Sequence, residues 1–201
     1  VTLDVGFDRN NVLLVQADLG AAKIPADRQA ATWQEIESRL STLPGVLSAA
    51  RSLVTPISGN QFLNNSVHTD WTKMSPGWGD DNKFLVSMDF ISPDYLPTLR
   101  MHLLAGRNFT GADMRSSRPI AIVDQTFARR FFPGLNPIGR TYLVGAPVAH
   151  RVEVVGLVED SKYLSLREEN RPVAFLPINQ IPPYSRNRQT VELRTASRRQ
   201  S

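Results

Sequence analysis

Apolar and polar residues follow two different periods in the first quarter of the chain. Residues 11–19 alternate, with leucine, valine and alanine on one face, which predicts a β-strand. Between residues 26 and 43 the apolar positions recur every three or four residues, which predicts an amphipathic helix. Residues 46–54 return to a loose alternation. The pattern therefore predicts a strand, a long helix and a second strand, with a right-handed crossover if the two strands are parallel neighbours.

The predicted helix has a clear stop signal at Pro44 and Gly45. Proline disfavours helical geometry at the residue before it, and glycine accepts the left-handed turn that often ends a helix. Further along, residues 83–90 have strand character. Ser92 is expected to cap the short helix that follows, with Pro93 at its first position.

A loop-rich stretch interrupts these elements between residues 55 and 82, around a weak strand near 67–72. It contains Trp71 and Trp78 in or beside the loops. A loop tryptophan usually covers a local apolar cluster. The alternative is contact with a partner or a membrane surface, so both residues are candidates for a partner contact.

A second helix is predicted after the short apolar strand PIAIV. Asp124 follows this strand and is expected to cap the helix. Phe127 and Phe131 lie one turn apart and are expected to pack inward together, whereas Arg129 and Arg130 face outward as solvated charges.

Strand-like runs make up the rest of the chain and are separated by turns rich in Gly, Pro and Asn; they lie at residues 142–144, 152–158, 173–176 and 190–194. The whole pattern gives two or three helices and about eight strands, without a repeat of fixed period. The predicted fold class is therefore α+β, a mixture of helices and strands.

Charge adds one feature to this picture. The chain has 201 residues, 41% hydrophobic, and a net charge of +4. Several arginines lie near the end of the chain, so the excess of positive charge forms a basic tail: Arg186, Arg188, Arg194, Arg198 and Arg199. Such a tail is either a solvated terminus or a contact for phosphate or an anionic membrane. Because it has no interleaved aromatic residues, the sequence does not predict nucleic-acid binding.

Candidate chemistry is sparse. The absence of cysteine excludes disulfides, thiolate zinc sites and cysteine nucleophiles. Phosphate-loop, dinucleotide, hydrolase-elbow and zinc-protease motifs are missing. His68 and Asp70 make a weak metal pair, and Asp80, Asp81 and Asn82 fit an acidic turn better than a calcium loop. The sequence therefore predicts neither an enzyme nor a cofactor.

One charged residue follows a glycine that permits a tight turn. Arg107 stands directly after Gly106, where its guanidinium can fork onto a carboxylate such as Asp89, Asp94 or Asp113. A structural ion pair is the expected use of this arginine, and ligand binding is the alternative.

The chain has no apolar stretch near the roughly 18 residues needed to cross a bilayer. Its first residues, VTLDVGFD, carry no basic region or apolar core of a signal peptide. We therefore expect a soluble chain or a soluble piece of a larger protein. The start in mid-pattern favours the second.

Several motifs in a fixed order resemble one known family. They are LPGVLSAA at 43–50, TPISG at 55–59, ISPDYLPTL at 91–99, LLAGRNF at 103–109, AIVDQTFARRFFPGLNPIGR at 121–140, VEVVGLVEDSKYLSLRE at 152–168 and FLPINQ at 175–180. Together they resemble the MacB-like periplasmic core domain of FtsX/MacB-type ABC transporter permeases, in the form found in acidobacterial permeases. The likeness covers nearly the whole chain.

The resemblance implies two mixed α/β subdomains. A porter-like βαβ module would comprise residues 1–90 and 186–201, with its C-terminal arm truncated and a sheet edge uncovered. Residues 91–185 would form a smaller inserted α/β module. Turn and core residues would provide the structural signature of this scaffold: Pro44, Gly45, Ser92, Pro93, Tyr95, Gly106, Arg107, Phe127, Phe131, Pro137, Gly139 and Gly156.

The resemblance also implies a location and partners. The domain would lie on the periplasmic face of the bacterial inner membrane, between two transmembrane helices of the same chain. Its other partners would be a cytoplasmic ATPase subunit or domain, and a periplasmic adaptor or a second copy. It would transmit motion of the flanking helices during export. The alternative is a free-standing extracytoplasmic protein that binds peptide or lipid through the Trp71 and Trp78 loops.

Two positions depart from the family pattern. Leu99 and Arg100 replace a Met-Gly pair, so a left-handed helix stop would fall on an arginine, and the turn is expected to take another shape. In the motif after residue 121, Asp124 and Gln125 replace Asn and Glu. The aspartate keeps the helix cap, whereas the lost glutamate removes a favourable charge near the helix start.

Overall fold

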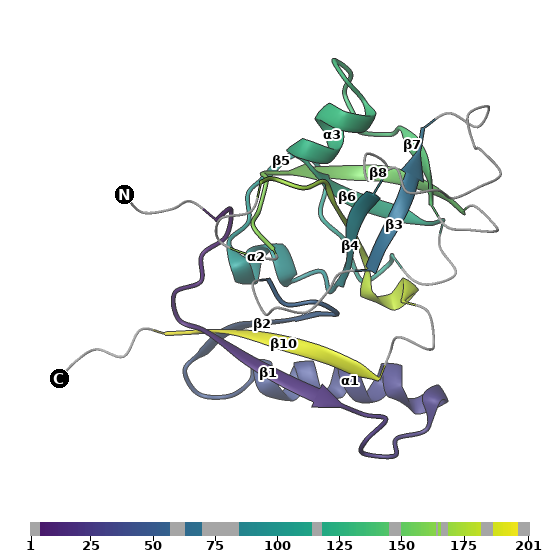
Figure 1. Cartoon of the computed structure of the whole chain (residues 1–201). Helices are drawn as coiled ribbons and strands as arrows, with labels where there is room; N and C mark the ends of the chain where they lie inside the picture. Colours follow the sequence, from purple (N-terminus) through teal and green to yellow (C-terminus); the bar gives the residue numbers. More distant parts are fainter. Residues whose placement is uncertain are drawn as a thin grey trace.

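The computed structural model has a mixed α/β fold of strands and short helices (Figure 1). The described part of the chain comprises residues 5–56, 63–69, 85–113, 118–144, 150–163, 165, 169–181 and 187–196. Within it lie ten strands and three α-helices, and a single 3-10 turn, η3, at Ile178–Gln180. Nine of these strands form two groups that share one hydrogen-bonded path, and the tenth, β5 (Leu103–Gly106), pairs with β8 off this path.

Six strands close into a small barrel. They pair in the ring β4-β3-β7-β8-β6-β9, and β9 pairs back onto β4. The pairs β4–β9 and β6–β8 are parallel and the other four are antiparallel. Closure leaves these strands without a free edge in the ring. Their bounds are β3 Leu63–His68, β4 Leu85–Ile91, β6 Ile120–Asp124, β7 Thr141–Val144, β8 His150–Val158 and β9 Val173–Pro177.

Alternate side chains of the barrel strands point into one apolar core. Val86, Met88 and Phe90 on β4 belong to it, as does Val123 on β6. Helix α3, Gln125–Phe131, contributes the fully buried ring of Phe127. The period of two along each strand separates this interior from the outer face of the barrel.

Three strands form a separate antiparallel sheet, the three-stranded sheet: β1 (Val12–Asp18), β10 (Arg188–Thr195) and β2 (Val46–Ser52). β10 lies between β1 and β2 and is antiparallel to both. The predicted strand–helix–strand unit is confirmed, but its two strands are not neighbours. Because β10 supplies the middle strand from the other end of the chain, the unit is a split βαβ motif.

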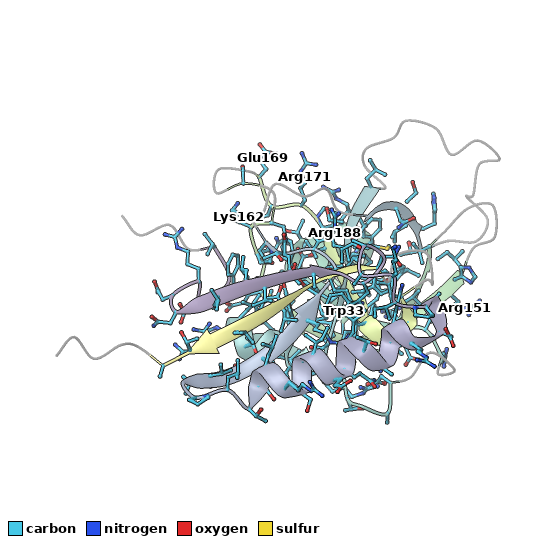
Figure 2. The ribbon with its side chains drawn as sticks, turned by 90° about the horizontal axis from the view of Figure 1, so that it is seen from below. Trp33, Arg151, Lys162, Glu169, Arg171 and Arg188 are labelled. Atoms are coloured by element: carbon cyan, nitrogen blue, oxygen red, sulfur yellow. The ribbon has the colours of Figure 1, made fainter. Side chains whose placement is uncertain are left out.

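Helix α1, Ala26–Ser41, covers this sheet across β2 and β10 (Figure 2). Trp33 is fully buried against Ala49, Val191 and Leu193. The helix stops three residues before Pro44, as the stop signal predicted. Burial of one apolar stripe holds the helix on the sheet.

The two strand groups meet at one narrow contact. β2 and β4 share a single residue pair, Ser52 with Ile91, and Leu53 N donates to Phe90 O over 3.0 Å. Helix α2, Tyr95–Leu99, lies beside this contact (Figure 1). A second apolar core, which includes Tyr95, Leu96 and Leu99 of this helix, packs there as well. The predicted subdomain boundary at residue 90 falls inside β4, and both β3 and β4 pair with barrel strands.

Candidate functional site

Ser92 ties the three-stranded sheet to helix α1. It was expected to cap α2, but α2 begins at Tyr95, and Asp94 at its N-cap makes no side-chain bond. The Ser92 hydroxyl instead accepts a hydrogen bond from Arg51 N at 2.9 Å and donates to Glu37 Oε1 at 2.8 Å. The prediction of a Ser92 cap was wrong because a long-range partner binds this hydroxyl.

Arg51 reinforces the same connection. Its Nε donates to Glu37 Oε2 over 2.6 Å, and one terminal nitrogen donates to Gln189 of β10 over 3.1 Å. The arginine side chain is almost wholly buried. Because a charged hydrogen bond is stronger than a neutral one, this pair fixes α1 against the sheet next to the barrel contact.

Two buried tyrosines lie on the barrel side of the contact. Tyr95 of α2 and Tyr163, beyond β8, share a hydrogen bond of 2.8 Å between their hydroxyls. Both rings pack against Phe175 of β9. Tyr163 also hydrogen-bonds the carboxyl of Asp89 on β4. The signature residue Tyr95 is thus part of a polar chain inside an apolar core.

Asp89 and Glu192 are two fully buried carboxyl groups in this region. Asp89 Oδ1 accepts from Val54 N at 3.0 Å, and Glu192 Oε1 accepts from the Ser52 hydroxyl at 2.6 Å. Burial raises the pKa of both groups well above the usual range, although these hydrogen bonds oppose the rise. The negative charge of Asp89 also raises the pKa of Glu192.

Helix α2 ends in a left-handed residue, as in the family, although that residue is an arginine. Arg100 has φ 54° and ψ 40°. Its N–H donates to Pro97 O, and Met101 N donates to Leu96 O, which is the bonding of a Schellman motif. The expectation of a different turn was wrong. The side chain of Arg100 also reaches Asp8 Oδ2 over 2.8 Å.

Residues 5–11 run along both strand groups; we call them the N-terminal strap. Asp8 N donates to Leu99 O at the end of α2, and Lys162 N, from the segment after β8, donates to Val5 O. Gly6 packs directly on Asp160, where a Cβ atom would lie 2.1 Å from the carbonyl oxygen. The strap therefore contacts α2 and the segment that leaves the barrel.

Arg194 fixes the same strap to the sheet. Its guanidinium donates to Thr98 O, Asn10 O and Asp8 O, at 2.6, 2.9 and 2.7 Å, and reaches Asp8 Oδ2 at 3.3 Å. The N–H of Asn10 and the charges of Arg194 and Arg100 hold the pKa of Asp8 below its usual value, although burial opposes them.

The predicted basic tail is therefore partly wrong. Arg194 is a buried member of β10, and Arg188, also in β10, pairs with Asp18 of β1 at 3.2 Å. The other three arginines of the predicted tail lie outside the described residues. Sequence position alone had grouped strand residues with the terminus.

Gly106 and Arg107 behave as predicted. Gly106 ends strand β5, Leu103–Gly106, with φ +76°, and a Cβ atom there would lie 2.2 Å from Val155 O. Arg107 forks onto both carboxylate oxygens of Asp113, at 3.0 and 3.1 Å. Hydrogen bonds from Arg107 and Thr110 hold the pKa of Asp113 low despite its partial burial.

Helix α3 is capped as predicted. Asp124 Oδ1 accepts from Phe127 N at 2.7 Å, and burial raises the pKa of Asp124 to about 8. Phe127 stacks on Phe131 with ring centroids 4.7 Å apart. Arg129 was expected to be a solvated charge, but it pairs with Asp160 at 2.6 Å.

Asp160 takes the place of the missing glutamate at the start of α3. Its Oδ1 accepts a hydrogen bond from Thr126 N at 2.6 Å, in the first turn of the helix. A negative charge at a helix N-terminus is favourable, whichever segment supplies it. The loss of the family glutamate is thus compensated by a residue from the segment after β8.

The remaining signature residues lie at turns and close contacts. Pro44 is exposed beside Gly45, which has φ +83°, and Pro93 O accepts from Asn108 Nδ2 at 2.8 Å. Pro137 is buried and Gly139 N donates to Val154 O. Gly156 leaves room for Arg107 O, which a Cβ atom would approach to 2.6 Å. These residues shape backbone rather than present chemical groups.

Some predicted residues cannot be placed. Trp71, Trp78, Asp70 and the acidic turn at 80–82 lie outside the described residues. Within the described ranges, no group of three or more His, Cys, Asp or Glu side chains could hold a metal ion. Among the helices described above, none is long and apolar enough to cross a membrane.

Sequence reasoning missed three residues that connect the two strand groups, Asp8, Tyr163 and Glu192, and it assigned a fourth, Arg194, to the basic tail. It named Asp89 only as one option for Arg107. A signal was present, because Asp89 and Glu192 interrupt the apolar runs LVSMDFI and TVEL. An acidic residue within a strand that is buried on both sides indicates a polar partner or a bound proton.

Comparison with known proteins identifies the family. The sequence profile of the MacB-like periplasmic core domain matches residues 3–200. The chain belongs to this family. It is therefore a periplasmic domain of a MacB/FtsX-like ABC transporter permease.

Solved structures of this kind share the fold. The periplasmic region of MacB from Actinobacillus actinomycetemcomitans matches with a TM-score of 0.58 and 16% identity, over 98% of this chain and 79% of that one. The extracellular domain of the noncanonic ABC-type transporter YknZ from Gram-positive bacteria matches with a TM-score of 0.56 and 19% identity, over 94% and 86% of the two chains.

A curated relative is the "Probable syringafactin export ATP-binding/permease protein SyfD" of Pseudomonas syringae pv. tomato. It is 33% identical to the chain over 75 residues. That alignment covers 37% of the chain but 11% of the relative. The chain thus aligns with only a small part of this relative's length.

Proposed function

We propose that this MacB-like domain is a non-catalytic transmission module of an export permease. It would carry the motion of the transmembrane helices that flank it to a substrate or a partner in the periplasm. ATP hydrolysed by a cytoplasmic subunit or domain would drive that motion. An adaptor protein or a second copy of the domain is the expected partner on the periplasmic side.

The N-terminal strap is the observation that supports this role most directly. It bonds to α2 through Asp8, to β10 through Arg194 and to the segment after β8 through Val5. Asn11 O, at the end of the strap, accepts from Thr195 N at the end of β10, over 2.8 Å. A pull on either segment would therefore act on the sheet and the barrel together.

The strand pairing supports a division into two modules for this purpose. The three-stranded sheet with α1 would be the porter-like module, next to the membrane helices. The barrel, which includes β3 and β4, would be the inserted module. Under this proposal the module border would lie between β2 and β4 instead of at residue 90.

The proposal can be tested in the full-length permease reconstituted in lipid vesicles. A fluorescent label on Cys at exposed Leu135, after helix α3, would report the distance from the barrel to labelled lipid. The described part of the chain contains no cysteine, so the label would be specific within it. We expect the distance to change on addition of ATP, and Asp8→Ala in the strap to reduce the change.

A matched variant shows whether the loss of any ion pair, and not only one in the strap, would reduce the ATP response. Asp18→Ala breaks the Arg188 pair on the edge strand, away from the strap, and is expected to leave the ATP response unchanged. An unmodified domain that shows no response to ATP would contradict the proposal. A saturable change of tryptophan fluorescence with lipid or peptide would favour a binding protein instead.

A further inference from the structure

Two buried carboxyl groups come from opposite sides of the contact between the strand groups. Asp89 belongs to β4 of the barrel, and Glu192 belongs to β10 of the three-stranded sheet. Neither has any exposed surface. Each keeps one oxygen, Asp89 Oδ2 and Glu192 Oε2, without a hydrogen-bond partner. A charged carboxylate in this position would lack both water and a counter-ion.

The neighbouring groups do not supply that counter-ion. Glu192 faces the hydroxyls of Ser52, at the end of β2, and Thr55, beyond that strand, at 2.6 and 3.5 Å from Oε1. Asp89 faces Val54 N and the Tyr163 hydroxyl. These partners are neutral. The hydroxyls can accept a hydrogen bond from a protonated carboxyl as well as donate one, whereas Val54 N only donates.

The nearby cations are already bound elsewhere. Arg194, two residues from Glu192 on β10, uses its guanidinium on Asp8 and on three carbonyl oxygens of the strap and α2. Arg51 of β2 pairs with Glu37 of α1. No ion pair between described residues includes Asp89 or Glu192.

We propose that Asp89 and Glu192 form a proton-binding site that couples protonation to the contact between the sheet and the barrel. With protons bound, both side chains are neutral and the contact stays closed. Opening of the contact admits water, and the carboxyls then release their protons. The ligand is the hydrogen ion itself, and no other reactant is needed.

The tyrosine pair links this site to the rest of the contact. Burial raises the pKa of Tyr95 and Tyr163, and a negative charge on Asp89 or Glu192 would raise the pKa of both further. Ionised carboxylates would therefore leave the tyrosines as neutral donors and would repel one another. The inference concerns the contact itself and does not depend on the proposed role in export.

The first test measures protonation directly in the 201-residue chain. Carbon-13 NMR of the side-chain carboxyls reports which are ionised at pH 7. We expect Asp89 and Glu192 to remain protonated and Asp18, an aspartate at the surface, to be ionised. Two carboxyls that both titrate with Asp18 would overturn the proposal.

The second test measures how often the contact between the sheet and the barrel opens. The amides of Leu53 and Val54 donate to Phe90 O and Asp89 Oδ1, so their hydrogen exchange reports its opening. After correction for intrinsic exchange, their protection should fall about tenfold per pH unit for each proton released on opening. The amide of Gly139, in the turn before β7, donates to Val154 O of β8 and should not follow this dependence.

Variants of the two carboxyl residues show which of them causes the pH dependence of amide exchange. Asp89→Asn and Glu192→Gln keep the shape but cannot ionise, so each should remove its share of the pH dependence at Leu53 and Val54. Asp124→Asn, a buried acid away from the contact, is the matched control and should leave that dependence intact. If the two contact variants retain the full dependence, the proposal is wrong.

Discussion

At the scale of single residues, the least expected feature is a left-handed arginine at the end of α2. Arg100 adopts φ 54° although its Cβ disfavours that region, which costs roughly 1 kcal/mol. Its partners on the strap offset part of this cost. A glycine would adopt the same conformation without the penalty.

This conformation gives a direct comparison of two substitutions. Both Arg100→Gly and Arg100→Ala remove the Asp8 ion pair, but only glycine relieves the backbone. We therefore expect the glycine variant to be more stable than the alanine variant by about 1 kcal/mol in urea unfolding. Equal stabilities would show that the arginine is not held in a left-handed turn.

Gly106 presents a different constraint, because its neighbours leave no room for a side chain. Gly106→Ala should destabilise the domain by about 2 kcal/mol or more, since φ is +76° and the new Cβ would meet Val155 O at 2.2 Å. Thermal unfolding of the variant checks this.

Gly134 is the matched control for Gly106. It has φ +71° and no atom within 4 Å of an added Cβ. Gly134→Ala should therefore destabilise the domain only through the unfavourable backbone conformation, by about 1 kcal/mol. If the two alanine variants lose the same stability, the close contact at Gly106 has no energetic weight.

At the scale of elements, α3 begins at a buried aspartate whose ionisation opposes folding. Its pKa is about 8 in the folded chain, against about 3.9 when unfolded. The folded state thus holds an extra proton between these values. The contribution of this bound proton to the free energy of unfolding is fully present below about pH 4 and is lost as the pH rises to about 8.

Asp124→Asn should therefore flatten the pH dependence of stability. Asparagine also caps helices, so the helix start is kept. Between pH 5 and 7 the free energy of unfolding should fall less steeply with pH in the variant than in the unmodified chain. The difference between the two slopes should be about 1.4 kcal/mol per pH unit. Urea unfolding across this range measures both slopes, and identical slopes would contradict a buried, protonated Asp124.

Local patterns predicted most elements but not their partners. The periodicity of residues 26–43 gave α1, and Asp124 marked the start of α3. The position of β10 between β1 and β2 depends on contacts across more than 130 residues, which no local pattern contains. Barrel closure also depends on a long-range pairing, between β4 and β9, which starts at Ser87 with Val173.

The candidate site was harder to predict than the fold. Gly106, Arg107 and Tyr95 stood out because turn and aromatic residues mark local geometry. Asp89 and Glu192 matter through burial, and burial depends on how two distant strand groups meet. Arg194 was mistaken for a tail residue because its partners Asp8 and Asn10 lie at the other end of the chain.

At the scale of the whole molecule, the two strand groups meet at a small contact that is reinforced by local hydrogen bonds and ion pairs. The three-stranded sheet and the barrel share a single strand pair, reinforced by the N-terminal strap, the Ser92 and Arg51 bonds and the buried carboxyls. A transmission module needs this contact to stay closed while the flanking helices move.

The most direct test is a distance across this contact in the full-length permease. Spin labels on Cys at Leu47 of β2 and at Leu135 beyond α3 lie on exposed positions of the two strand groups, 63% and 51% accessible. The account predicts one narrow distance distribution near neutral pH, unchanged between the nucleotide-free and ATP-bound states. A distribution that broadens or shifts when ATP binds would show that the domain bends within itself and would contradict rigid transmission.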